Sequence, residues 1–172
     1  MKKYTYFFTI RKLFWINYIY LMNSKLKTFP EKLYTCWHPI GYSHEIKSDK
    51  PFGSILLDEA IVVWRTSEGK PHAMRDLCIH RGTALSLGWI KDDCLVCPYH
   101  AWQYNNKGSC VLIPQAKDIE IPPKAKTPTY YCQEKFGIVW VALKAPEFEL
   151  PNVPEFYSND WKLVNTGPFN WN

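Results

Sequence analysis

The feature that most constrains this chain is a pair of short segments that each offer one cysteine and one histidine. Cys78 and His80 are separated by a single residue, and Cys97 and His100 follow sixteen residues later with two residues between them. Thiolates and neutral imidazoles are both good ligands for transition metals. The fold therefore has to bring two tight loops together if all four side chains serve one metal centre.

Two thiolates and two imidazoles in mixed pairs are the ligand set of a Rieske [2Fe–2S] centre, in which one iron keeps two cysteines and the other takes two histidines. The pattern resembles the Rieske proteins. Among them it is most similar to the terminal oxygenase components of Rieske non-haem iron oxygenases, of the aromatic-ring-hydroxylating and vanillate-demethylase-like kind. This resemblance implies a [2Fe–2S] cluster whose ligands are Cys78, His80, Cys97 and His100.

Zinc is the main alternative to the iron–sulfur cluster, because zinc also binds sets of cysteines and histidines. Cys94 and Cys97 form a C-x-x-C pair, which is a common zinc-ligand spacing. The mixed composition of each pair, and the single residue between Cys78 and His80, disfavour this zinc-binding structural module. The last alternative is a set of ordinary buried cysteines and hydrogen-bonded histidines, and four such residues at this spacing disfavour it too.

The residues around the ligands favour the low-potential type of Rieske centre. High-potential Rieske proteins carry a disulfide between the ligand loops and a serine hydroxyl aimed at a cluster sulfur, and both raise the potential. In this chain Thr83, Tyr99 and Trp102 stand at those positions. Arg81, directly after the first histidine, is typical of the oxygenase type of Rieske centre. Ala101 departs from this type, because the family usually has glycine at that position. We expect Tyr99 and Trp102 to shield the cluster from water.

Composition agrees with a compact redox domain of the cytoplasm. A chain of 172 residues that is 47% hydrophobic and 16% aromatic can bury one good core. The cysteines outside the ligand set have no repeating framework, so they are predicted to be buried free thiols. They are Cys36, Cys94, Cys110 and Cys132.

The formal net charge of +5 comes mostly from the N-terminal segment. Residues 1–21 contain four basic residues and no acid, which leaves 17 basic and 16 acidic residues in the rest of the chain. The sequence has no basic stripe interleaved with aromatic residues, which is the pattern that would favour nucleic acid as a partner. The longest uncharged run, Leu13 to Ser24, is too short for a membrane span, which needs ~20 residues. A helix on a membrane surface is one interpretation of residues 1–21; an extension or a misassigned start before Met22 is the one we favour.

The rest of the sequence predicts β-structure in hairpins, with no long helical periodicity. The expected strand pairs are Ser54–Leu57 with Ile61–Arg65, Trp89–Ile90 with Cys94–Val96, Gln103–Tyr104 with Cys110–Ile113, and Tyr130–Cys132 with Ile138–Leu143. The predicted fold class is all-β. The resemblance implies a Rieske-type antiparallel β-sandwich over residues 22–145, with the two ligand loops at one tip.

Several other residues invite a functional interpretation but have a simpler one. The remaining histidines have no partner at ligand spacing and are expected to be structural or at the surface: His38, His44 and His72. Four aromatic residues are expected to fill the core: Trp37, Tyr42, Trp89 and Trp140. Asp76 and Arg81 flank the first ligand pair, where they tune the centre, form part of a docking surface or merely cap the loop.

The C-terminal part limits the functional prediction. Residues 146–172 begin with a proline-punctuated linker, and Asp160–Val164 is expected to begin a new element. In the resembled oxygenases such a stretch opens an α+β catalytic domain with a mononuclear Fe(II) site. No histidine follows His100, so a site of two histidines and a carboxylate is expected only beyond residue 172. The 172-residue chain is therefore expected to be inactive alone.

The resemblance implies the function of one-electron transfer within an oxygenase. A reductase or ferredoxin would reduce the cluster, and the oxygenase, a monooxygenase or a dioxygenase, would hydroxylate or demethylate an organic substrate, aromatic or cyclic. The full-length subunit is expected to be a homo-oligomer. The alternative is a free-standing Rieske ferredoxin, which carries electrons and is not an enzyme.

Overall fold

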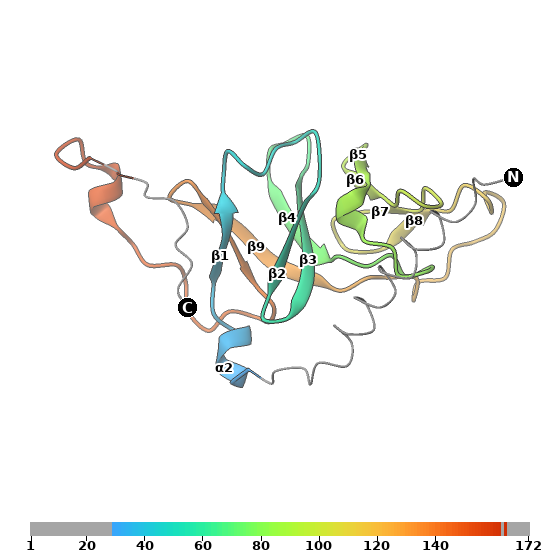
Figure 1. Cartoon of the computed structure of the whole chain (residues 1–172), viewed down its shortest axis with the longest axis horizontal. Coiled ribbons are helices and arrows are strands. Elements are labelled where there is room, and N and C mark those ends of the chain that lie inside the picture. The colour runs from blue at the N-terminus through green and yellow to red at the C-terminus, as the bar shows by residue number, and fades with distance from the viewer. Residues whose placement is uncertain (1–28, 163, 165–172) are drawn as a thin grey trace, which may run out of the picture.

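The computed structural model describes residues 29–162 and residue 164, and its strands form two antiparallel sheets (Figure 1). The larger sheet contains, in spatial order, β1 (His38–Tyr42), β10 (Ile138–Ala142), β9 (Thr129–Lys135), β4 (Pro71–Arg75), β3 (Glu59–Arg65) and β2 (Phe52–Leu56). The smaller sheet contains β5 (Trp89–Lys91), β6 (Cys94–Val96), β7 (Gln103–Tyr104) and β8 (Cys110–Leu112). The helical elements are α2 (Glu31–Tyr34) and the 3₁₀ helices η1 (Leu85–Leu87) and η2 (Pro154–Tyr157).

All four predicted hairpins are present, and the all-β, antiparallel fold class is confirmed. The β2–β3 hairpin turns one residue earlier than expected, at Leu57 and Asp58, which have φ of 50° and 62°. Asp92 and Asp93 turn the β5–β6 hairpin in the same way, with φ of 49° and 63°. Two successive residues at positive φ match the right-handed twist of the paired strands. The position of each turn therefore depends on the twist of the paired strands as well as on the polarity of the sequence.

Two strands were not predicted from the sequence, β4 and the edge strand β1. β1 contains Pro39 and Gly41, residue types that are depleted in strands, yet it pairs with β10 along its length. Proline is tolerated in an edge strand because one side of that strand needs no ladder hydrogen bond. β1 is the edge of the larger sheet, so its composition is compatible with pairing.

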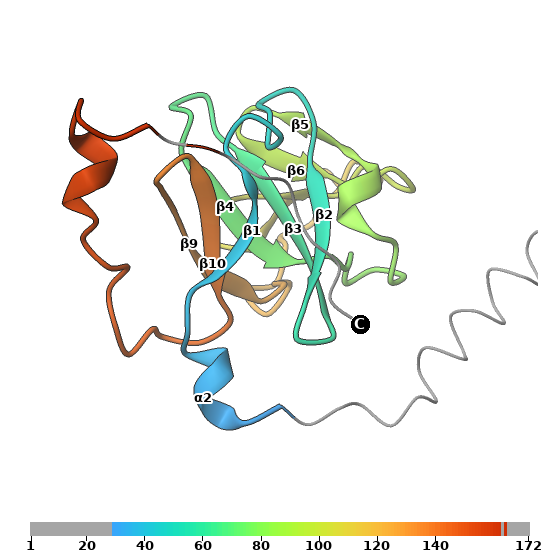
Figure 2. The same cartoon turned by 60° about the vertical axis from the view of Figure 1, so that its left-hand side comes forward.

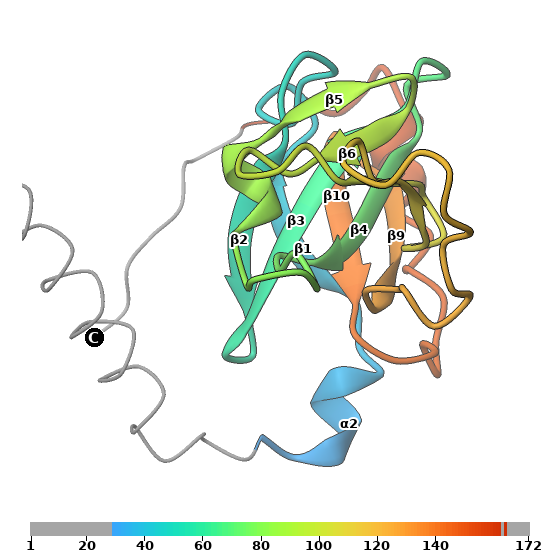
Figure 3. The same ribbon diagram turned by 90° about the vertical axis from the view of Figure 1, so that its right-hand side faces the viewer.

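β3 is buried on both faces and carries two hydrophobic clusters. Val62 and Trp64 point to one side and belong to the cluster between the two sheets. Ile61 and Val63 alternate with them and pack against Val139 on the other side of the sheet. Figure 3 shows β5 and β6 crossing in front of β3 and β4. Burial on both faces explains why β3 is an unbroken apolar run.

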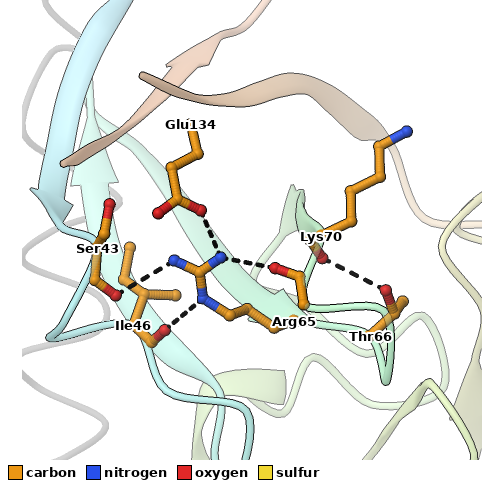
Figure 4. Close-up of polar contacts among 7 residues, drawn as sticks. Ser43, Ile46, Arg65, Thr66, Lys70 and Glu134 are labelled. Carbon is orange, nitrogen blue, oxygen red and sulfur yellow. Dashed lines mark hydrogen bonds and ion pairs between the residues drawn. The ribbon is translucent and has the colours of Figure 1, made fainter. Parts of the chain in front are cut away.

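A partly buried arginine ties the end of β3 to its neighbours (Figure 4). The side chain of Arg65 is only 12% exposed and pairs with Glu134 of β9 at 2.6 Å. Its guanidinium also donates to the backbone oxygens of Ile46 at 2.7 Å and Ser43 at 3.2 Å, in the β1–β2 connection. This hydrogen bond from Arg65 lowers the pKa of Glu134. The three segments are thereby fixed at the end of the sheet.

A short segment before β9 joins the two sheets. Cys110 in β8 donates to Ala125 O at 2.8 Å, and Thr127 donates to Gly108 O at 2.9 Å. Gly108 has φ +75°, and a Cβ there would lie 2.2 Å from Thr127 O. Only glycine permits this approach. The chain then continues into β9, so one segment links the smaller sheet to the larger.

The proline-rich linker after β10 packs back onto the β9–β10 turn. Phe156 of η2 lies edge-on to Phe136 with ring centroids 5.1 Å apart. Figure 2 shows the red helical turn of η2 to the left of β9 and β10. Lys135 donates to the backbone oxygens of Leu150 and Pro151. Within 160–164, where a new element was expected to begin, the described residues lie in no helix or strand, and residues 163 and 165–172 lie outside the described residues. The 3₁₀ turn η2 lies before this stretch, and Pro154 supplies the fixed φ of its first residue.

The membrane-surface interpretation applies to residues 1–21 alone. Within residues 29–162, no helix is long and apolar enough to cross a bilayer. The interpretations of residues 1–21 lie outside the described residues.

Candidate metal centre

Two loops at the junction of the sheets carry the four candidate ligands. The first ligand loop, residues 78–83, lies between β4 and η1, and the second ligand loop, residues 97–102, lies between β6 and β7. β4 belongs to the larger sheet and β6 to the smaller one. The cluster of apolar side chains between the sheets therefore sets how the loops face each other.

The two ligand loops have the same backbone hydrogen bonds. In the first, the N–H of Cys78 donates to Thr83 O at 2.8 Å, and the N–H of Gly82 donates to Cys78 O at 2.8 Å. The second loop makes the same pair of bonds, from Cys97 N–H to Trp102 O at 2.9 Å and from Ala101 N–H to Cys97 O at 3.0 Å. Each cysteine is thus held by its own six-residue loop.

Each loop also needs a left-handed residue four positions after its cysteine. Gly82 has φ +70° and Ala101 has φ +56°. Glycine adopts this conformation at no steric cost, whereas alanine pays for its Cβ. The departure from glycine at position 101 is therefore a real backbone strain and not a different loop shape.

The structure brings all four candidate ligands together in two pairs. Cys78 and Cys97 are each 1% exposed and belong to the same buried cluster. The imidazoles of His80 and His100 face each other nearer the surface, with ring centroids 4.7 Å apart. His80 is exposed and His100 half-buried. A pair of thiols thus lies inside and a pair of imidazoles outside.

This arrangement fits a two-iron cluster. Nδ1 of His100 is buried and has no hydrogen-bond partner among the residues that the structure describes. Buried polar atoms normally have a partner, and a metal ion would supply one. Across residues 29–162, no three or more His, Cys, Asp or Glu side chains converge on a position for a single ion. Donors in two like pairs are what a [2Fe–2S] cluster with two different iron sites needs.

The local electrostatics differ between the thiol and the imidazole pairs. Burial raises the pKa of the Cys78 thiol, the Tyr104 hydroxyl lowers it, and the neighbouring Cys97 raises it. Metal must therefore displace the Cys78 proton, since the thiolate is the ligand. Desolvation lowers the pKa of His80, and nearby His100 and Arg81 lower it further. The neutral imidazole, which is the form that binds metal, is favoured.

Tyr104 is a site residue that the sequence reasoning missed. Its hydroxyl lies 3.1 Å from Cys78 Sγ, and the residue is fully buried in β7. Burial raises the pKa of Tyr104, so the phenol stays protonated and can donate to a thiolate. The available signal was its position two residues after Trp102, because alternate strand residues share a face.

Both predicted shielding residues lie against histidines, in different ways. The Trp102 ring is parallel to the His80 ring within 1°, with centroids 4.5 Å apart. The Tyr99 ring lies 3.8 Å from that of His100, tilted by 36°. Trp102 is partly buried against the core cluster, whereas Tyr99 is 57% exposed. Trp102 is therefore the less exposed of the two, although the Tyr99 ring lies nearer to its histidine.

Side chains outside the ligand loops brace both of them. The carboxylate of Asp76 accepts hydrogen bonds from the backbone N–H of Ser86 at 2.7 Å and from its hydroxyl at 2.5 Å. Asp76 is thus a capping residue that closes the segment containing the first ligand loop. The amide of Gln115 donates to His100 O at 2.9 Å. Arg81 is exposed beside the site.

The other histidines have partners that are not metal ligands, as expected. His38 Nε2 lies 2.8 Å from Leu33 O, His72 packs on Trp64, and His44 stacks on Tyr42.

None of the four aromatic residues expected in the core is fully buried: Trp37, Tyr42 and Trp140 are half-buried. Two predictions of burial were wrong outright. Cys36 is exposed, because it follows the short helix α2 at the edge of the domain. Trp89 is 44% exposed, since it lies on β5, an edge strand of the smaller sheet. Cys110 is buried, and Cys94 and Cys132 are partly buried. Burial raises the pKa of Cys110 to about 11 and that of Cys132 to about 12.

An antiparallel β-domain with two cysteine–histidine loops at its sheet junction defines an iron–sulfur protein of the Rieske class. Residues 36–130 match the model of the Rieske [2Fe-2S] domain, and the chain belongs to this family. The cofactor of the family is a [2Fe–2S] cluster.

Several relatives are named as demethylases or as oxygenases. Methylxanthine N1-demethylase NdmA of Pseudomonas putida is 37% identical over 143 residues, which cover 78% of this chain and 40% of the relative. The oxygenase component of 3-ketosteroid-9-alpha-monooxygenase of Rhodococcus rhodochrous is 34% identical, over 73% of this chain and 34% of the relative. The structure of NdmB of Pseudomonas putida CBB5 has a TM-score of 0.70 and 34% identity, over 76% and 41% of the two chains. The chain spans about 40% or less of the length of these relatives.

Proposed function

We propose that Cys78, His80, Cys97 and His100 hold the [2Fe–2S] cluster, with both thiolates on one iron and both imidazoles on the other. The observation that carries the proposal is the buried thiol pair beneath the imidazole pair, with an unpartnered Nδ1 on His100. When bound, the cluster supplies one-electron transfer.

The protein residues around the ligands have separate tasks in this proposal. The apolar cluster that contains Cys78 and Cys97 keeps water from the thiolate side. Tyr104 donates a hydrogen bond to Cys78 Sγ, which favours the more negative, reduced state. The imidazole of His80 lies at the surface, which brings that side of the centre close to a docked redox partner.

We further propose that the domain serves an oxygenase that hydroxylates or demethylates an organic substrate, aromatic or cyclic. A reductase or ferredoxin would supply the electrons, and a mononuclear Fe(II) in a catalytic domain would receive them. The names of the relatives, a methylxanthine demethylase and a ketosteroid monooxygenase, support this proposal. Residues 146–172 are proposed to be the linker and the beginning of that catalytic domain.

A second candidate is an electron carrier or a domain of a reductase. Oxidoreductase NdmD of Pseudomonas putida is 32% identical to this chain over 130 residues, which cover 75% of the chain and 21% of NdmD. The same domain type therefore also occurs in a protein named as an oxidoreductase. In this candidate the cluster would pass electrons to another protein and no substrate would be oxidised by the same subunit.

Metal analysis tests the cluster assignment. A chain reconstituted anaerobically with iron and sulfide should contain two irons and two acid-labile sulfides per monomer. Stoichiometric zinc without labile sulfide would overturn the proposal in favour of a zinc module.

Voltammetry tests the oxygenase type of the centre. Thr83, Tyr99 and Trp102 replace the disulfide and the serine donor of high-potential centres. We therefore expect a potential near the low end of the Rieske range, roughly −150 mV. A potential well above zero would contradict the oxygenase assignment.

An oxygen-incorporation assay tests where the substrate chemistry resides. Because no histidine follows His100, the reduced 172-residue chain should give no hydroxylated product with oxygen and aromatic substrates. Incorporation of labelled oxygen into substrate would show a second iron site within these residues.

A further inference from the structure

No protein group that the structure describes orients the His80 imidazole through a hydrogen bond. Metal-binding histidines normally donate their second ring nitrogen to a carboxylate, a backbone carbonyl or water, which fixes the ring. Within residues 29–162, no side chain or backbone group hydrogen-bonds to the His80 imidazole, and the exposed Arg81 follows it in the chain. His80 is also exposed, so packing in the core does not hold it.

One ring contact takes the place of that hydrogen bond. The indole of Trp102 lies 4.5 Å from the His80 imidazole, centroid to centroid, with the planes parallel within 1°. Aromatic rings prefer such stacked arrangements at about this separation. The contact runs between the two ligand loops, since His80 belongs to the first and Trp102 to the second. A ring stacked parallel to the imidazole restricts the tilt of the imidazole plane. This tilt decides where the ring nitrogen points, and therefore whether it can bind the metal.

Trp102 is itself fixed on the other side. Its backbone oxygen accepts the Cys97 N–H at 2.9 Å, and its side chain packs against the buried cluster that contains Cys78 and Cys97. Directly after it the chain enters β7. The indole plane is therefore a rigid surface whose position is tied to the second ligand loop.

We propose that Trp102 is a positioning residue, whose indole sets the orientation of the His80 imidazole toward its iron. This inference rests on the proposed function, because it takes His80 as a ligand. It differs from shielding: a shield needs only bulk and apolarity, whereas orientation needs a flat ring.

Phenylalanine and leucine separate these two roles. Trp102→Phe keeps a flat ring, and Trp102→Leu keeps an apolar side chain without one. Trp89→Leu is the matched control, because Trp89 is a partly exposed tryptophan of β5 and lies outside both ligand loops. The reduced, cluster-loaded proteins are compared by the histidine nitrogen couplings in pulsed electron paramagnetic resonance. A second measurement is the rate at which a chelator removes iron.

We expect Trp102→Leu to broaden or shift the nitrogen couplings of one histidine and to release iron roughly two- to tenfold faster. Trp102→Phe and Trp89→Leu should stay close to the unmodified chain. If leucine abolishes cluster loading while phenylalanine permits it, the inference is also supported. Equal behaviour of the leucine and phenylalanine variants, loaded or unloaded, overturns it. An unmodified chain without a [2Fe–2S] cluster would overturn the proposed function itself.

Discussion

The two ligand loops share one backbone design but differ in how they support their histidines. Both hold a cysteine through the same two backbone hydrogen bonds, and both place a left-handed residue four positions later. In the second loop His100 is half-buried, is held through its carbonyl by Gln115 and packs on Tyr99. In the first loop His80 is exposed and lies against Trp102 of the other loop. Each loop therefore fixes its own cysteine through its backbone, whereas aromatic side chains of the second loop lie against both imidazoles.

The largest effect is expected at the cysteines, where the loops are alike. Cys78→Ser and Cys97→Ser should each abolish the cluster and loosen the fold, since the free energy of metal binding contributes to folding. Iron and sulfide per chain, together with the midpoint of urea unfolding, measure both effects. Cys94→Ser is the control, because Cys94 lies outside the two pairs; loss of iron in that variant would show that the wrong cysteine is assigned.

Replacing the histidines should have the next largest effect. His80→Cys and His100→Cys should retain more iron than the corresponding alanine variants, because a thiolate can still bind iron. Iron content after anaerobic reconstitution, with absorption spectra, makes the comparison. An alanine variant of either histidine with full iron content and an unchanged spectrum would remove that residue from the ligand set.

Tyr104 offers a test of an asymmetry between the thiolates. Tyr104→Phe removes the hydroxyl 3.1 Å from Cys78 Sγ with little change of volume. We expect the potential to fall by about 20–60 mV, the equivalent of one hydrogen bond for a one-electron couple. Protein-film voltammetry of both proteins measures the shift, and Tyr99→Phe, which changes an exposed hydroxyl, is the control. An unchanged or higher potential would mean that this hydroxyl does not donate to the thiolate.

The smallest effects concern the left-handed residues, and they should have opposite signs. Ala101→Gly removes the strain of an alanine at φ +56°, about 1–2 kcal/mol, and costs about 0.4–1 kcal/mol in the unfolded chain. Gly82→Ala reverses the change; its Cβ would have space, with the nearest atom Leu77 Cδ1 at 3.9 Å. We expect a gain of roughly 0.5 kcal/mol for the first variant and a similar loss for the second. Urea unfolding under argon measures both, and shifts of the same sign would show that the loops are not equivalent.

The sequence predicted those parts of the molecule that depend on short-range patterns. Alternating apolar runs around polar turns located the hairpins, and the ligand spacing located both loops. The deviation at Ala101 was also visible, because a tight loop needs a residue that tolerates positive φ. The assignment of the four ligands stays a prediction that the structure supports through their proximity.

What the sequence did not predict depends on contacts between distant segments. β1 forms because β10 offers it an edge, which no local propensity records. The Tyr104–Cys78 contact joins residues 26 positions apart. Trp89 was expected in the core on composition alone, but an edge strand has an outer face. Such errors arise where tertiary position overrides residue type.

Mössbauer spectroscopy of the chain reconstituted with ⁵⁷Fe tests the central claim, that both loops jointly hold one cluster, most directly. A cluster with two cysteines on one iron and two histidines on the other contains two different iron sites in equal amounts. The account therefore predicts two doublets of equal area from the oxidised protein. A single kind of iron site, or iron that binds without sulfide, would contradict it.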